Sequence, residues 1–311
     1  MAFYTEAASA FATKRTMARA IDMLRGMIRI VRPHQWTKNL FVIAPVVFSK
    51  ELGSPPHLLK TLAAAFLFCL ASGAVYTMND VVDAPRDRLH PVKRNRPVAS
   101  GLLPVEVASA YALLLAGVAL GASAAFGARF IVVLAVYLVL NIVYSFWLKK
   151  VVVADVVSIA AGFLLRVVAG SQAAQVQASV WILACTFLLA LFLALGKRRH
   201  ELLVAERGSG SRPVLRFYSP RMVKILMIVV AALTVLAYTA YTVSPHTRAY
   251  FGTDNLIVTV PFVLITLWRF VSITGVKERS ESPTDAMIRD VPFILTAVLW
   301  FATVIVVIYV L

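Results

Sequence analysis

The sequence contains few cysteines, and this shortage excludes several kinds of site. Only two occur among 311 residues, and neither Cys69 nor Cys185 lies in a CxxC pattern or near a histidine. Both lie within apolar runs, so we expect reduced packing residues rather than a disulfide framework or a zinc site. Gly-rich phosphate loops and the GxSxG and HExxH motifs are absent as well. Any phosphate-binding site must therefore depend on a metal ion and on basic side chains.

Acidic residues are also scarce. The chain carries 15 Asp and Glu against 31 Lys and Arg, a formal net charge of +16. Hydrophobic residues make up 60% of the chain and the mean hydropathy is +0.81, which predicts an all-α polytopic membrane protein. A basic chain can bind nucleic acid, but here the bases lie in short segments between apolar runs, as topology-setting and lipid-facing charges do. We therefore expect contact with membrane lipids and no nucleic-acid partner.

The apolar runs predict nine membrane-spanning helices. Before them, residues 17–32 place apolar and basic side chains on different sides, which predicts an amphipathic helix in the membrane interface. The N-terminus lacks a basic segment followed by an uninterrupted apolar core, so no cleaved signal peptide is expected. We therefore divide the chain into a cytoplasmic tail with its interfacial helix, 1–35, and a single transmembrane catalytic domain, 36–311. The spans are expected at about 36–50, 59–79, 105–127, 129–147, 152–172, 178–196, 222–243, 254–273 and 291–311.

The distribution of basic residues predicts the topology of these spans. Of the 31 Lys and Arg residues, 26 fall on one side: seven at 14–38, five at 86–96, two at 149–150, eight at 197–224 and four at 269–289. Four fall on the other side, and Arg166 lies within a span. Because cytoplasmic loops carry the excess of positive charge, we expect a multi-pass protein of the inner (plasma) membrane with a cytoplasmic N-terminus.

Charge is most concentrated at residues 79–101, directly after an apolar run. Asn79, Asp80, Asp83 and Asp87 follow spacings of three and four, so a helix would bring their oxygen atoms to one face. Carboxylates so close repel one another unless a cation neutralises them. Hard oxygen ligands without His or Cys suit Mg²⁺, which usually completes its coordination with phosphates of a substrate. Pro85 disfavours a continuous helix here, so direct metal ligation by Asp87 is left open.

Basic residues that could bind a phosphate-rich ligand follow at once. The same stretch contains Arg86, Arg88, Lys93, Arg94 and Arg96. The alternative is a solvated loop in which acids and bases neutralise one another. Lys38, one turn inside the first expected span, is either a base that extends to the interface or a phosphate ligand.

Three further constellations lie in the second half of the chain. Asp155 and Arg166 are eleven residues apart on one face of a span, which fits either a structural ion pair or a polar wall of a cavity. Tyr144 and Lys149 end another span, either as an ordinary helix exit or as phosphate donors. The segment Lys197-Arg198-Arg199-His200-Glu201 is either a stop-transfer run or part of a site. Glu201 lies on the face of Lys197 and could ligate metal or accept a hydrogen bond from a sugar hydroxyl.

The motif Asn79-Asp80-x-x-Asp83-x-x-x-Asp87, followed by His90-Pro91, Lys93-Arg94, Arg96-Pro97 and Ala99-Ser100-Gly101, resembles the first aspartate-rich motif of the UbiA-type membrane prenyltransferase superfamily. This resemblance spans essentially the whole chain and implies nine helices around a central cavity. Most members carry a second motif, DxxxD, after the sixth helix, where this sequence has Lys197-Arg198-Arg199-His200-Glu201.

That departure, with Arg-Pro-x-Gln-Trp-x-Lys-Asn at 32–39, Ser282-Pro283 and Asp290, resembles the decaprenyl-phosphate phosphoribosyltransferase branch. The resemblance implies Mg²⁺-dependent transfer of 5-phosphoribosyl from 5-phosphoribosyl-1-diphosphate to a polyprenyl (decaprenyl) phosphate, with release of diphosphate, in cell-envelope arabinan precursor synthesis. The alternative is an aromatic prenyltransferase of the same superfamily that uses a polyprenyl diphosphate donor. A third hypothesis is a transporter or lipid-binding protein.

These hypotheses assign roles to particular residues. We expect the metal on Asn79, Asp80, Asp83 and Asp87. Polyprenyl chain length and homo-oligomerisation are left open. The residues expected to act in catalysis are Asp80, Asp83, Lys38, Arg94, Arg96 and Lys197, and those expected to bind substrate are Asn79, Tyr144, Lys149, Arg166, Arg198 and Glu201.

Overall fold

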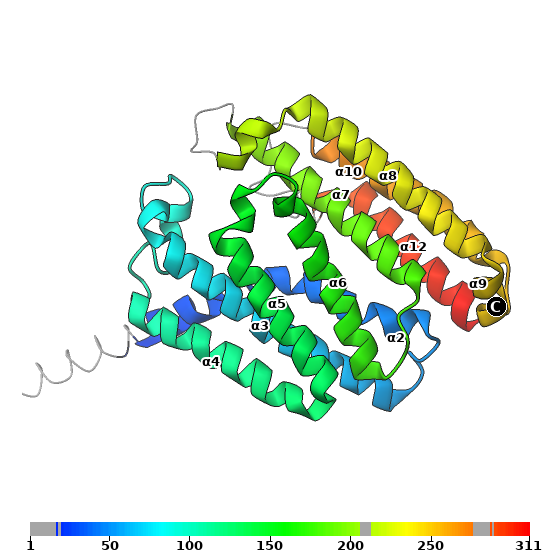
Figure 1. The fold of residues 1–311 in the computed structure, drawn as a ribbon, viewed down its shortest axis with the longest axis horizontal. Helices are drawn as coiled ribbons and strands as arrows, with labels where there is room; N and C mark the ends of the chain where they lie inside the picture. Colours follow the sequence, from blue (N-terminus) through cyan, green and yellow to red (C-terminus); the bar gives the residue numbers. More distant parts are fainter. Residues whose placement is uncertain (1–16, 18–19, 206–212, 276–286, 288) are drawn as a thin grey trace, which may run out of the picture. The chain divides into compact units, whose positions relative to one another are not determined.

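The computed structural model describes residues 17, 20–205, 213–275, 287 and 289–311, and these ranges contain helices and connections but no strand (Figure 1). Eight helices within these ranges are long and apolar enough to cross a membrane. The expected all-α membrane fold is therefore confirmed. These helices are built on α3 (Pro55–Asp87), α4 (Val105–Ser123), α5 (Ala128–Phe146), α6 (Ala154–Ala174), α7 (Val180–Ala205), α8 (Pro220–Val243), α10 (Val260–Ile273) and α12 (Val291–Tyr309).

The first expected span, 36–50, takes another form. The chain runs as a 3-10 helix, η1 (Pro33–Val42), and then as the short α-helix α2 (Ala44–Phe48). Pro45 lies in the first turn of α2, where its missing N–H group leaves no hydrogen bond unmade. Gly170 of α6 explains how closely η1 can approach, because a Cβ atom there would overlap the carbonyl group of Val42. A side chain at that position would therefore push the two segments apart.

Contacts between residues divide the chain into two compact units, and each is described by itself. The first comprises Met1–Asn39 and Phe66–Ala125, and the second comprises Leu40–Ala65 and Phe126–Leu311. The expected boundary at residue 35 separates a cytoplasmic tail from a catalytic domain. It is a different kind of division from these contact-based units, and it stays a prediction.

The core of the first unit joins helical residues 20–30 to α3 and α4. Ile30, Val98 and Leu103 are almost completely buried there. Gly73 of α3 lies against Val31, because an added Cβ atom would be 3.1 Å from the Val31 Cγ1 atom. This close approach fixes the segment at Val31 against the aspartate-bearing helix.

The second unit is a series of packed helices. α5 packs on α6, α6 on α7 and α7 on α8, while α10 packs on both α8 and α12 (Figure 1). Phe192 and Phe270 pack with ring centroids 5.1 Å apart, and Met227 of α8 lies in the same core cluster. Gly196 leaves room for the Phe270 ring, which a Cβ atom would overlap. Apolar contacts therefore hold α7 in place directly before its charged residues 197–201.

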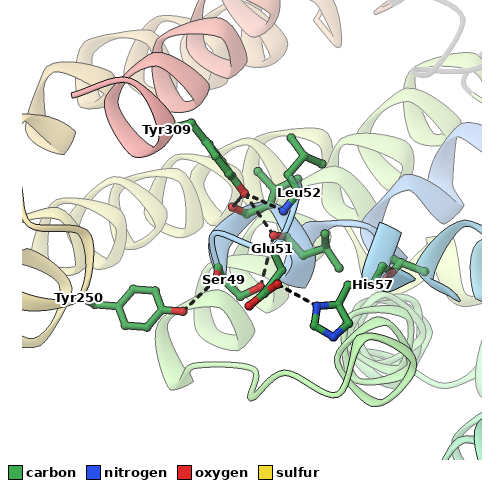
Figure 2. Close-up of polar contacts among 9 residues, drawn as sticks. Ser49, Glu51, Leu52, His57, Tyr250 and Tyr309 are labelled. Atoms are coloured by element: carbon green, nitrogen blue, oxygen red, sulfur yellow. Dashed lines mark hydrogen bonds and ion pairs between the residues drawn. The ribbon is translucent and has the colours of Figure 1, made fainter. Parts of the chain in front are cut away.

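The connection between α2 and α3 is fixed by polar contacts from distant parts of the second unit (Figure 2). The Tyr309 hydroxyl accepts a hydrogen bond from the Leu52 amide at 3.2 Å, and the Tyr250 hydroxyl donates to a main-chain carbonyl of the connection at 3.0 Å. His57, in the first turn of α3, has its Nδ1 atom 2.8 Å from a carboxylate oxygen of Glu51 in the connection. These contacts tie α12 and α9 (Pro245–Phe251) to the beginning of α3.

The orientation of the spans stays a prediction. Several bases that support it lie outside the described residues, as does the Ser282-Pro283 pair. Those bases are Lys14, Arg15, Arg19, Arg207, Arg212, Lys277 and Arg279.

Candidate functional site

All four expected metal-ligating residues lie near the C-terminal end of α3. This helix continues through Pro85 and ends at Asp87, so the expectation that Pro85 interrupts it is wrong. The cost of Pro85 is small here because it is exposed and lies in the last turn, where few residues follow that depend on the helical hydrogen bonds. The spacing of three and then four places Asp80, Asp83 and Asp87 on one helix face.

Two of these carboxylates are buried and paired with guanidinium groups. Arg32 Nη2 lies 2.6 Å from Asp80 Oδ1. Arg96 Nη1 lies 2.5 Å from Asp87 Oδ2 and 3.5 Å from Asp80 Oδ1, so it bridges the two acids. The side chains of Asp80 and Asp87 are 1% and 5% exposed, whereas those of Arg32 and Arg96 are 22% and 27% exposed. The acids are therefore fixed inside while their counter-ions reach the surface.

Arg32 was expected as a topology-setting base and as the first residue of the motif at 32–39, but its place beside Asp80 was missed. Its backbone has a φ of +52°, a left-handed conformation that is uncommon outside glycine. Its guanidinium carbon lies 5.4 Å from the centroid of the Tyr76 ring. The Arg-Pro pair in the sequence was the available signal for a break in the helix at Arg32, because a residue before proline is disfavoured from the helical conformation.

The connection after α3 positions Arg96 but leaves Arg94 exposed. Val98 is 1% exposed and anchors the connection in the core. The chain then reverses through hydrogen bonds from Ser100 N to Arg96 O, 2.8 Å, and from Leu103 N to Pro97 O, 2.9 Å. Arg86, Arg88 and Lys93 are exposed along with Arg94.

His90 caps this connection through its ring. Its Nδ1 atom accepts from the amide groups of Val92, 3.2 Å, and Lys93, 3.3 Å. Burial, with the charge of Lys93 adding to it, lowers the pKa of His90. Both effects favour the neutral ring, which is the form that can accept these bonds.

The residues around Asp80 fit a cation in their chemistry. The described ranges hold no group of three or more His, Cys, Asp or Glu side chains arranged to hold a metal ion. Between the oxygens of Asp80 and Asp87, however, lies the positively charged Nη1 atom of Arg96. Carboxylate oxygens suit Mg²⁺. A metal ion held by both Asp80 and Asp87 would take the place that Arg96 Nη1 occupies between them.

Lys38 and Asn39 lie at the end of the first unit's N-terminal segment. Lys38 Nζ donates to Gln35 Oε1 at 3.0 Å, and its side chain is half-buried. Asn39 is 2% exposed and its Nδ2 atom donates to Cys69 Sγ at 3.1 Å. Cys69 is buried, Cys185 is half-buried, and both are free thiols, as expected.

In the second unit, Arg198 of α7 lies between two carboxylates. Its Nε atom is 2.8 Å from Asp155 Oδ2, and its Nη1 atom donates to Glu201. The side chains of Arg198 and Asp155 are 0% exposed, whereas that of Glu201 is 23% exposed. Arg198 Nε and Asp155 Oδ2 do not meet hydrogen-bond geometry, so their contact is an ion pair. Tyr144, expected to bind substrate, accepts from Arg198 Nη2 at 3.4 Å.

Tyr218 holds the other oxygen of Asp155. Its hydroxyl donates to Asp155 Oδ1 at 2.9 Å and accepts from the Val153 amide at 2.9 Å. Burial, with Asp155 adding to it, raises the pKa of Tyr218, so the hydroxyl remains a donor. Neither Tyr218 nor Asp155 was among the expected site residues. They are 63 residues apart, and no local pattern in the sequence links them.

The expected pairing of Asp155 with Arg166 is wrong. Arg166 donates to Gly162 O and to the Tyr137 hydroxyl, each at 2.9 Å, and its guanidinium lies 4.7 Å from the centroid of the Tyr137 ring. Eleven residues of α-helix span about 16 Å along the axis. Two side chains can share a face at that distance without touching.

The three consecutive bases of α7 lie in different surroundings. Lys197 is exposed and Arg198 is buried. Arg199 Nη1 donates to Val271 O at 2.8 Å and to Thr274 Oγ1 at 3.3 Å, at the C-terminal end of α10. Because helix C-termini carry partial negative charge, Arg199 stabilises the fold there. Lys149, in the short 3-10 segment η4 (Leu148–Lys150), is half-buried.

Comparisons with known proteins identify the family of the chain. The model of the UbiA prenyltransferase family matches residues 40–201. The chain belongs to this family.

Relatives and solved structures extend the UbiA comparison over most of the chain. The chain is 32% identical to a decaprenyl-phosphate phosphoribosyltransferase of Corynebacterium glutamicum, over 93% of this chain and 89% of that protein. It is 31% identical to the protein of that name from Mycobacterium tuberculosis H37Rv, over 91% and 94%. The structure of a UbiA homolog from Archaeoglobus fulgidus bound to GPP and Mg²⁺ has a TM-score of 0.69 and 21% identity, over 92% of this chain and all of that chain. Together they identify a multi-pass membrane transferase with the UbiA fold.

Proposed function

We propose that this UbiA-family transferase moves a 5-phosphoribosyl group from 5-phosphoribosyl-1-diphosphate to a polyprenyl phosphate and releases diphosphate. Decaprenyl phosphate is the proposed acceptor, in cell-envelope arabinan precursor synthesis at the inner membrane. The observation that carries the proposal is the similarity to two decaprenyl-phosphate phosphoribosyltransferases over nine tenths of the chain.

In the first unit, the proposed role is to hold the diphosphate end of the donor. Asn79, Asp80, Asp83 and Asp87 would hold Mg²⁺, which supplies positive charge against the departing diphosphate. Arg96 is supported as a diphosphate ligand because it is 27% exposed and its counter-ions are the same acids that would bind the metal. Released from those acids, its guanidinium can form paired hydrogen bonds to phosphate oxygens. Lys38 and Arg94 are proposed as further ligands.

Lys197, Arg198 and Glu201 are proposed to bind the ribose phosphate and hydroxyl groups. Lys197 is exposed and can donate to a phosphate, while the partly exposed Glu201 can accept from a hydroxyl. Arg198 has no exposed surface, so direct contact with the donor would require its ion pairs to part. It therefore enters this proposal through Glu201. Tyr144, Lys149 and Arg166 are proposed to line the substrate region.

The acceptor needs no general base in this scheme. A polyprenyl phosphate is already anionic at neutral pH, so its oxygen can attack the anomeric carbon directly. Its hydrocarbon tail remains in the membrane.

A second candidate is an aromatic prenyltransferase with a polyprenyl diphosphate donor. The fold supports it, since a structural neighbour was solved with GPP and Mg²⁺. Against it stands the cluster at 197–201, which has one acid and a run of bases where most family members have a second aspartate motif. A second metal site of carboxylates is therefore not supported there.

A donor panel with the purified protein in detergent tests the choice. With decaprenyl phosphate and Mg²⁺ present, label from 5-phosphoribosyl-1-diphosphate should enter the lipid extract, and omission of the lipid phosphate should abolish this. If that donor is ignored while a prenyl group is attached to an aromatic acid, the phosphoribosyl assignment is wrong and the family membership stands.

A further inference from the structure

The start of α6 is held in a conformation that local sequence does not favour. Val153 directly precedes this helix and has a φ of +68° and a ψ of −47°. A positive φ in a β-branched residue is a genuine outlier, and such strain persists only where surrounding contacts impose it. The side-chain contact of the Val153 backbone is the hydrogen bond from its amide to the Tyr218 hydroxyl, while its carbonyl accepts from the first turn of α6. Tyr218 thus fixes both the backbone before α6 and, through its donated bond, the carboxylate of Asp155.

We propose that Asp155 and Tyr218 are positioning residues that act through Arg198 to orient the Glu201 carboxylate toward the hydroxyl groups of a phosphorylated pentose. This inference rests on the proposed function. The inference adds to that function a chain of contacts that sets donor specificity. This chain runs from Tyr218 to Asp155, then to Arg198 and finally to Glu201.

The burial of the network supports this direction. One guanidinium lies between two carboxylates. Asp155 is fully buried and Glu201 is 23% exposed, so Glu201 is the carboxylate that a ligand can reach. A carboxylate accepts hydrogen bonds strongly and repels phosphate. It therefore suits the hydroxyl groups of a sugar, which a prenyl chain lacks.

The burial of Arg198 explains why it can position Glu201. Its Nε atom faces Asp155, its Nη1 atom faces Glu201 and its Nη2 atom faces Tyr144. With these three directions engaged, the planar group cannot rotate without breaking an ion pair in a dry environment. The Nη1 atom of Arg198 therefore donates to Glu201 from a fixed direction.

Steady-state kinetics with the ribosyl donor test the inference. Tyr218→Phe removes the hydroxyl but keeps the ring, so the first link is lost with little change in packing. We expect the KM for the donor to rise about tenfold, with kcat changed much less, as for the weakening of a hydrogen bond to a charged group. Asp155→Asn should act in the same direction.

Tyr238→Phe is the matched control. Tyr238 is a buried tyrosine of the same unit whose hydroxyl contacts Thr259 Oγ1 at 2.8 Å and Trp300 Nε1 at 3.0 Å, outside this network. It should change thermal stability without the selective rise in KM. If it raises KM as much as Tyr218→Phe, the positioning role is refuted and a general loss of stability explains both.

A double variant tests whether the effect passes through Glu201. Glu201→Gln alone should raise KM, and adding Tyr218→Phe should then change KM little further, because the final link is already weakened. Additive effects would overturn the chain of contacts. The wild type should use a donor analogue with a deoxyribose ring less well than the ribosyl donor. In Glu201→Gln this difference between the two donors should be smaller. A difference as large as that of the wild type would refute the hydroxyl contact.

The wild-type measurement separates the two proposals. If the wild type does not turn over 5-phosphoribosyl-1-diphosphate, the proposed function fails and this inference fails with it. If turnover is normal but Tyr218→Phe leaves KM unchanged, only the positioning network is refuted.

Discussion

Two groups of ion pairs differ in how far their guanidinium groups reach the surface. Asp80 and Asp87 are buried, but their partners Arg32 and Arg96 are 22% and 27% exposed. In the other group, Arg198 is as fully buried as Asp155. A partly exposed guanidinium can turn toward solvent or a ligand when another cation neutralises its acid, whereas separating a fully buried pair leaves an uncompensated charge in a dry environment. The first group is therefore suited to exchange counter-ions, and the second to hold a fixed geometry.

Arg198→Met should have the largest effect, because it leaves the acids of its network without their counter-ion. We expect the free energy of unfolding to fall by about 3–5 kcal/mol, measured by thermal unfolding in detergent. Lys224→Met, at an exposed position of α8, is the control and should change stability by less than about 0.5 kcal/mol. Equal losses from the two variants would contradict the distinction between buried and exchangeable pairs.

Asp80→Asn should lower activity strongly while changing stability little. Turnover should fall about 10²-fold or more, because a negative ligand for the proposed metal is lost at the departing diphosphate. Stability should change little, since Arg32 and Arg96 can both turn toward solvent. Ribosyl transfer and thermal unfolding are measured on the same preparation, with Asp22→Asn, in the exposed part of helix 20–30, as control. Near wild-type turnover at saturating Mg²⁺ would rule out the ligand role.

Arg96→Gln should give a smaller and more selective effect. If Arg96 leaves Asp80 and Asp87 and binds the diphosphate, this variant loses charge-assisted hydrogen bonds to the donor. The KM for the donor should then rise about 10- to 100-fold. Thermal stability should fall by less than in Arg198→Met, because Arg96 is partly exposed and Arg32 still neutralises Asp80. Arg88→Gln removes an exposed charge from the same segment and should leave KM unchanged. A stability loss like that of Arg198→Met would show that Arg96 is a fixed structural ion.

The aspartate register could be predicted from sequence because it depends on local spacing. Asp80, Asp83 and Asp87 lie on one helix, and a spacing of three and four decides which face they share. The spans were predictable for a similar reason, since each apolar run is local. The segment 36–50 was harder, because a short run with Pro45 can form a 3-10 helix as well as a span.

The partners of the charged groups could not be predicted, because they come from distant parts of the chain. Arg32 lies 48 residues before Asp80, and Tyr218 lies 63 residues after Asp155. A row of three bases likewise does not reveal that Arg198 is buried while Lys197 is exposed. Packing of α7 against its neighbours decides that difference.

The smallest expected effect is the coupling between Asp155 and Arg166. Their shared helix face suggested a pair, but Asp155 lies against Arg198 and Tyr218, while Arg166 donates to Tyr137 and Gly162. Mutations at sites about 7–10 Å apart or more, without shared partners, usually add to within roughly 0.5 kcal/mol. In a double-mutant cycle of thermal stability, Asp155→Asn and Arg166→Gln should therefore be additive.

The same cycle with Asp155→Asn and Arg198→Met supplies the contrast and should show coupling of about 1 kcal/mol or more, because those two side chains touch. Strong coupling to Arg166 would mean that the buried network extends along α6 toward Tyr137. Absence of coupling to Arg166 would confine the buried network to the start of α6 and the charged end of α7. There, Glu201 is the part of the network that a donor can reach.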